Sequence, residues 1–91
     1  MKQVFQVHVR NSMGLHTRPA TVIVKLLQDC KSNVLFTCKK ETVNAKSILG
    51  ILMLAATKNS KIIVTVDGGD AEETKVKLIE AFENKFWEEL A

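Results

Sequence analysis

The sequence has few of the residues on which several classes of protein depend. Its two cysteines, Cys30 and Cys38, form no CxxC pair, and only two histidines could join them. This supports neither a zinc site nor a disulfide framework, so we expect reduced thiols and no metal or cofactor. Aromatic residues make up 5% of the chain, tyrosine is absent, and no known nucleic-acid-binding motif is present. We therefore expect no nucleic-acid partner.

Long hydrophobic runs are missing too. The longest apolar stretch, residues 48–56, is interrupted by Gly50 and is too short to cross a bilayer. The chain begins with Met1 and Lys2 and continues directly into an alternating segment, without the apolar stretch of a signal peptide. We expect a cytoplasmic protein that does not insert into membranes, with residues 1–91 forming a single domain.

The basic residues are concentrated in the first two thirds of the chain. Residues 1–66 contain ten Lys or Arg and two Asp or Glu, a net charge of +8, whereas residues 67–91 contain three and eight, a net charge of −5. Charge of one sign on a surface speeds the encounter with partners of the opposite sign. We therefore expect acidic partner surfaces and phosphorylated donors to approach the basic part.

Hydrophobic periodicity predicts four strands and three helices. Their order, strand-helix-strand-strand-helix-strand-helix, predicts an α+β fold of the open-faced β-sandwich type, a four-stranded antiparallel sheet with three helices on one face (βαββαβα). A ferredoxin-like sheet is the alternative, because its elements come in nearly the same order. The predicted strands are residues 2–9, 34–38, 41–43 and 62–66, and the predicted helices are residues 16–28, 48–55 and 71–90.

Three local patterns lead to more specific predictions. Asp70 and Glu73 have the spacing of a capping box at the start of the last helix. Lys39 and Lys40 form a tight turn between two strands, and because lysine is poorly suited to positive φ we expect an unusual or strained turn there. The apolar stripe predicted for the last helix consists of Val76, Ile79, Phe82, Phe86 and Leu90.

Residues 14–20, Gly-Leu-His-Thr-Arg-Pro-Ala, place a nucleophile where a helix begins. Pro19 suits a first helical turn. The N–H groups of Thr17 and Arg18 then have no partner within the helix and carry the positive end of its dipole. With the Arg18 guanidinium, they predict a cradle for a tetrahedral anion such as phosphate. Because an imidazole nitrogen can attack phosphorus, His16 is the predicted phosphoryl acceptor; a ring that only caps the helix is the alternative.

The attack on phosphorus needs a neutral imidazole. A helix N-terminus and a nearby arginine both disfavour the imidazolium, so we expect the neutral form of His16 to be favoured. In the loop before the histidine, Gly14 permits a backbone turn that a Cβ would hinder. Asn11 or Ser12 can brace this loop through side-chain hydrogen bonds.

A second motif, Asn-Ala-Lys-Ser-Ile-Leu-Gly at residues 44–50, begins a short apolar helix with Ser47 as its predicted N-cap. The helix is more apolar than one core-facing stripe requires, so we expect part of it to face outward as a docking surface for partners. A helix that only fills the core is the alternative. The residues predicted for docking are Lys46, Ile48, Leu49, Leu52 and Met53.

The two motifs resemble the active-site and regulatory-serine signatures of the HPr family, the histidine-containing phosphocarriers of the bacterial phosphoenolpyruvate:sugar phosphotransferase system. Their separation, the chain length and the element order fit this family as well. The resemblance implies that His16 accepts a phosphoryl group at Nδ1 from enzyme I and passes it to IIA-type domains of sugar permeases, assisted by Arg18 and Thr17. It implies a carrier with a covalent phosphohistidine intermediate and not a stand-alone catalyst, and we expect a monomer.

The resemblance also implies that an HPr kinase/phosphorylase phosphorylates Ser47 in some bacteria. A phosphate there would add about two negative charges within the docking surface and hinder the binding of an acidic partner. This leaves open a regulatory binding protein controlled by Ser47, in a carbon or nitrogen control branch without sugar transport. A small binding module whose resemblance is accidental is a further alternative.

Overall fold

The computed structural model describes residues 1–90, with side chains through Glu88. This part of the chain contains no helix long and apolar enough to cross a membrane. Its elements are β1 (Lys2–His8), α1 (Thr17–Leu27), β2 (Asn33–Cys38), β3 (Glu41–Asn44), α2 (Ile48–Leu54), β4 (Lys61–Asp67), α3 (Ala71–Glu83) and a 3-10 helix η1 (Lys85–Leu90).

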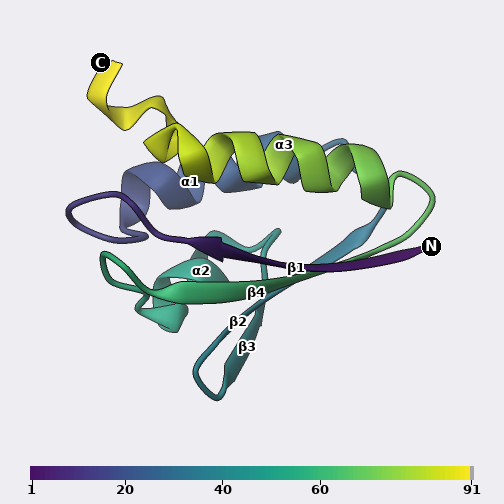
Figure 1. Cartoon of the computed structure of the whole chain (residues 1–91), viewed down its shortest axis with the longest axis horizontal. Coiled ribbons are helices and arrows are strands. Elements are labelled where there is room, and N and C mark those ends of the chain that lie inside the picture. The colour runs from purple at the N-terminus through teal and green to yellow at the C-terminus, as the bar shows by residue number, and fades with distance from the viewer. Residues whose placement is uncertain (91) are drawn as a thin grey trace.

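The strands form one antiparallel sheet in the order β1-β4-β2-β3 (Figure 1). β4 lies between β1 and β2, and Asp67 at its end pairs with Lys2 on one side and Asn33 on the other. β3 pairs only with β2 and forms an edge of the sheet. The predicted four-stranded antiparallel sheet is confirmed. The ferredoxin-like alternative is wrong, because it would place β3 between β1 and β2.

One face of the sheet carries the hydrophobic core. α1 and α3 lie side by side over this face (Figure 1), and α2 packs against α1 and β3. The opposite face has no helical cover, and the side chains of Val4, Leu35 and Ile63 are exposed there. The alternation predicted for the strands is confirmed by the buried residues Val34, Phe36, Cys38, Ile62, Val64 and Val66.

The last helix is shorter than predicted, and its predicted stripe is confirmed only in part: Phe82 is buried and Ile79 is partly buried against the core. α3 ends at Glu83, and the side chain of Val76 is 59% exposed. Phe86 is buried, but it lies beyond α3, and the side chain of Leu90 lies outside those described. Residues 85–87 all have φ between 53° and 55°, a left-handed conformation that costs about 1–2 kcal/mol per residue and ends the helical spacing. The residues of α3 that are buried are Ala71, Thr74, Leu78, Ala81 and Phe82.

Asp70 occupies the N-cap position of α3, but the predicted capping box with Glu73 does not form, because the Asp70 side chain makes no cap hydrogen bond. Its carboxylate instead accepts hydrogen bonds from the backbone N–H groups of Lys31 (2.8 Å) and Ser32 (2.9 Å) and from the Ser32 hydroxyl (2.5 Å). Asp70 therefore ties the α1–β2 loop to the start of α3. These bonds, with the Ser32 hydroxyl first among them, lower the pKa of Asp70 from 3.8 to about 2.

Asp70→Asn is expected to lower the free energy of unfolding near neutral pH. The carboxyl titrates at 3.8 when unfolded and at about 2 when folded, so its contribution is complete above pH 3.8 and is lost as the pH falls through about 2. The difference between the variant and the unmodified protein should therefore shrink over that interval, as measured by urea unfolding. Asp29→Asn is the control, because this exposed carboxylate has no partner among the described residues. Equal behaviour of the two variants would contradict the assignment.

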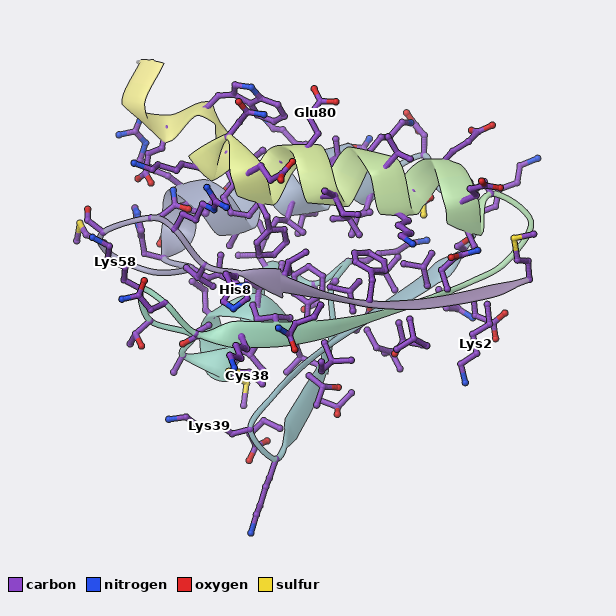
Figure 2. All side chains as sticks on the ribbon, in the orientation of Figure 1. Lys2, His8, Cys38, Lys39, Lys58 and Glu80 are labelled. Carbon is purple, nitrogen blue, oxygen red and sulfur yellow. The ribbon has the colours of Figure 1, made fainter. Side chains whose placement is uncertain are left out.

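The turn between β2 and β3 is strained, as predicted. Cys38 pairs with Glu41, which leaves Lys39 and Lys40 as a two-residue loop. Lys39 has a φ of 58°, a left-handed conformation, whereas Lys40 does not. Figure 2 shows the Lys39 side chain at the hairpin end that points away from the helices.

Lys39→Gly is expected to raise the free energy of unfolding by about 0.5–1 kcal/mol. Glycine removes the left-handed strain, but it loses more backbone entropy on folding than lysine does, which offsets part of the gain. Lys40→Gly is the matched control. It relieves no positive φ, so it should be slightly destabilising. Chemical denaturation of both variants measures the difference. If the Lys39→Gly protein were less stable than the Lys40→Gly protein, the assignment of backbone strain to Lys39 would be wrong.

Candidate functional site

His16 is the N-cap residue of α1, at the point where the loop becomes a helix. Its backbone is extended (φ −82°, ψ −166°), and its carbonyl accepts the first helical hydrogen bond from Ala20 N–H at 3.0 Å. A helix beginning at or just after His16 is therefore confirmed. The imidazole makes no cap hydrogen bond to the helix, so the alternative in which the ring only caps α1 is wrong.

The first turn of α1 presents unpaired donors. Within the described part of the chain, the N–H groups of Thr17 and Arg18 have no acceptor, and Pro19 has no N–H to contribute. The exposed Arg18 guanidinium likewise has no hydrogen bond or ion pair with any described residue. No acidic residue lies in this turn. The free N–H groups, the helix dipole and the guanidinium together suit a tetrahedral dianion.

The two ring nitrogens of His16 lie in different surroundings. Nε2 is buried and lies 2.7 Å from Oε2 of Glu88, a distance typical of an ion pair but without the alignment of a hydrogen bond. Nδ1 has no partner among the described residues and, unlike Nε2, is not buried. The His16 side chain as a whole is 26% exposed. Nδ1 is therefore the nitrogen that an incoming group can reach.

The loop that carries His16 is held by its own backbone and by the segment after α2. Gly14 has a φ of 69° and packs against the backbone of Ala56 and Thr57. The N–H of Leu15 donates to the carbonyl of Ala56 at 2.9 Å, and the Leu15 side chain is buried. The predicted role of Gly14, a turn that a Cβ would hinder, is confirmed.

The loop is also braced by Asn11, which is buried, whereas Ser12 is exposed. The Asn11 amide donates to the carbonyl of Lys85 at 2.8 Å and to Oε1 of Glu88 at 2.7 Å. The brace was predicted, but its partner was not, because nothing local to Glu88 connects it with a loop 77 residues away. The only signal in the sequence is the acidic excess after residue 66.

α2 presents an apolar outer surface. Ile51 and Leu54 face the core, and the Ser47 hydroxyl caps the helix by accepting the N–H of Gly50 at 3.1 Å, as predicted. Lys46 donates through Nζ to the carbonyl of Cys30 at 2.8 Å, so its ammonium tethers two loops. The four predicted apolar docking residues are 37–71% exposed: Ile48, Leu49, Leu52 and Met53. Their role in docking stays a prediction.

His16 and Ser47 are connected to opposite ends of the same short helix. The loop before His16 bonds to Ala56, just after the C-terminal end of α2, whereas Ser47 begins it. A helix of seven residues is about 10 Å long. The apolar surface of α2 therefore lies between the two motifs.

The described residues contain no group of three His, Cys, Asp or Glu arranged to hold a metal ion. Cys30 and Cys38 are both free, Cys38 buried and Cys30 partly buried. What the site offers is therefore an accessible imidazole nitrogen, unpaired helix N–H groups and a guanidinium.

A family model described as the PTS HPr component phosphorylation site matches residues 4–84. The chain belongs to the HPr family. It is 44% identical over 82 residues to the phosphocarrier protein HPr of Chlamydia muridarum, covering 88% of this chain and 77% of that protein. It is 38% identical over 84 residues to the HPr of Xylella fastidiosa, covering 92% and 94%. Family membership makes the chain an HPr-type phosphocarrier of the phosphotransferase system.

The fold comparison agrees with this assignment. The crystal structure of an HPr from Thermoanaerobacter tengcongensis matches with a TM-score of 0.90 at 31% identity, covering 94% of this chain and 97% of that one. An HPr from Bacillus anthracis matches with a TM-score of 0.84 at 34% identity, covering 89% and 96%. The resemblance to HPr in the sequence is thereby confirmed over nearly the whole chain.

Proposed function

We propose that His16 accepts a phosphoryl group at Nδ1 from the phosphohistidine of enzyme I and passes it to IIA-type domains of sugar permeases. The observation that carries this proposal is the contrast between the two ring nitrogens, an accessible Nδ1 and an Nε2 buried against Glu88. A nucleophile at the start of a helix whose first N–H groups are unpaired is suited to hold phosphorus covalently.

The same groups support transfer in both directions. The N–H groups of Thr17 and Arg18 and the Arg18 guanidinium would stabilise the charge on phosphorus as it moves between two imidazole rings. Thr17 and Arg18 are both exposed, so this stabilisation is screened by water and stays modest. A carrier must release its phosphoryl group, and an open site favours release.

The docking surface proposed for these partners is the exposed apolar side of α2, with Ile48, Leu49, Leu52 and Met53. Lys46, the fifth residue of the predicted docking set, adds a basic charge just before the N-cap of α2, and such a surface suits acidic partners with an apolar contact area. We infer that residues 1–91 act as one domain and as a monomer in the cytoplasm. An HPr of T. tengcongensis and Crh of Bacillus subtilis have been crystallised as dimers, so sedimentation at micromolar concentration is the measurement that checks the monomer.

Incubation with phosphoenolpyruvate and enzyme I tests the relay. The expected product carries one phosphate that is labile in acid and stable in alkali, and peptide mass spectrometry should place it on His16. Addition of a IIA domain should remove it. Phosphate that appears only with ATP and a protein kinase, and that maps to Ser47, would contradict the relay and favour the regulatory binding protein.

A further inference from the structure

The segment after α3 turns back onto the active site. Lys85, Phe86 and Trp87 adopt a left-handed conformation, and the side chain of Phe86 is buried edge-on against Phe82, with ring centroids 4.8 Å apart. Such a conformation persists only where the surrounding contacts determine it. Here the burial of Phe86 and the bonds of Asn11 hold the turn, which directs Glu88 toward α1 and not outward along the axis of α3.

The Glu88 carboxylate is engaged through both oxygens. Oε1 accepts from the buried amide of Asn11, and Oε2 lies against Nε2 of His16, each at 2.7 Å. Asn11 precedes the histidine in the same loop, so its side chain holds the carboxylate next to the residue that carries the imidazole. Glu88 is thus fixed on the ring edge opposite the accessible Nδ1.

We propose that Glu88 is a positioning residue that keeps the ring proton of His16 on Nε2, which leaves the lone pair of Nδ1 free to attack phosphorus. An ionised carboxylate only accepts hydrogen bonds. A protonated Nε2 presents a partial positive charge to the carboxylate and an unprotonated Nε2 a partial negative one, so the approach of Oε2 to 2.7 Å favours Nε2–H. In a neutral imidazole with the proton on Nε2, the nucleophilic nitrogen is Nδ1.

The transfer of the phosphoryl group needs no reactant besides the two histidines. The Nδ1 lone pair forms the new N–P bond while the N–P bond of the donor phosphohistidine breaks, and that electron pair returns to the donor ring. The His16 ring keeps its Nε2 proton throughout and becomes cationic as the bond forms. Glu88 offsets this cation from the side away from phosphorus, where its charge repels the phosphoryl group least. This inference rests on the proposed function.

Glu88 also changes the charge distribution that the sequence predicted for the site. The start of α1 and the Arg18 guanidinium contribute positive charge, whereas Glu88 contributes a negative charge at Nε2, and this carboxylate was not anticipated. The site therefore places positive potential where the phosphoryl group binds and negative charge behind the ring. Such an arrangement polarises the imidazole along the direction of attack.

The tautomer of His16 tests the proposal directly. In protein labelled with ¹⁵N in its histidine side chains, the two ring shifts report which nitrogen carries the proton. At a pH where the ring is neutral, the unmodified protein is expected to show only the Nε2–H form, and Glu88→Ala a mixture of both forms. Glu83→Ala, which removes an exposed carboxylate at the end of α3, should retain the Nε2–H form. A proton on Nδ1 in the unmodified protein, or equal tautomer populations with and without Glu88, would overturn the proposal.

Kinetics of phosphorylation by enzyme I provide the second measurement. Glu88→Ala is expected to lower kcat about fivefold, because one partly exposed charge pair is lost, with KM for the carrier unchanged. An unchanged kcat, or a change in KM alone, would count against the positioning role. If the unmodified protein accepts no phosphoryl group at all, the proposed function fails, while the ¹⁵N spectra still decide whether Glu88 sets the tautomer.

Discussion

His16→Ala is expected to abolish phosphoryl acceptance from enzyme I, reducing the rate by at least about a thousandfold. The methyl group of alanine has no nitrogen to form the N–P bond, and neither Thr17 nor Arg18 can replace it. The variant should remain folded, since the His16 side chain is partly exposed and its contact with Glu88 is a single, partly exposed pair worth at most about 1 kcal/mol. Radiolabel transfer from phosphoenolpyruvate, with a thermal unfolding curve, measures both quantities.

His8→Ala is the matched control, because His8 is the other histidine and lies exposed on β1, opposite Lys61. It should accept phosphate at the rate of the unmodified protein. Acid-labile phosphate that persists in His16→Ala and disappears in His8→Ala would refute the assignment of the acceptor.

Gly14→Ala is expected to lower the free energy of unfolding by roughly 2–5 kcal/mol and to slow phosphoryl acceptance severely. The φ of 69° at Gly14 disfavours any side chain. The added Cβ would also collide with the carbonyl oxygen of Ala56 and lie 2.9 Å from Cα of Thr57, and both are backbone atoms that cannot rotate away. Relief of the collision would break the hydrogen bond between Leu15 and Ala56 that holds the loop before His16.

Gly69→Ala provides the control for this substitution. A Cβ at Gly69 meets nothing within 4 Å, and the residue is exposed, so stability should change by less than about 0.5 kcal/mol. Urea unfolding gives the stability of both proteins, and amide spectra show whether the loop at residues 10–16 has moved. If the Gly14→Ala protein were as stable as the Gly69→Ala protein, Gly14 would not be packed closely against Ala56.

Most of the fold was predictable because local periodicity and burial agree. Strand residues such as Phe36 and Val64 recur at every second position with other apolar residues and are buried where the pattern predicted. Ser47 caps α2 through the bond expected of an N-cap serine. At these positions the short-range preference of the backbone and the tertiary contacts favour the same conformation.

The predictions that were wrong are those in which a distant partner outweighed the local pattern. Asp70 had the spacing of a capping box, yet its carboxylate binds the loop at Lys31 and Ser32. Val76 shared the spacing of Phe82, yet it faces solvent, because the helix ends at Glu83 and its orientation is set by packing on α1 and β1. Spacing along one helix defines a stripe but not which stripe the sheet covers.

The sequence by itself predicted His16 as the candidate acceptor, the start of α1 at that residue, the cap of α2 and the strands of the sheet, because each of these follows from residues within one turn or one strand of each other. Only the tertiary structure decided which ring nitrogen of His16 is open. That choice depends on Glu88, which reaches the ring through a left-handed turn for which Lys85, Phe86 and Trp87 have no intrinsic preference. The turn is stabilised by the burial of Phe86 and by the amide of Asn11, contacts that exist only once both ends of the chain have met.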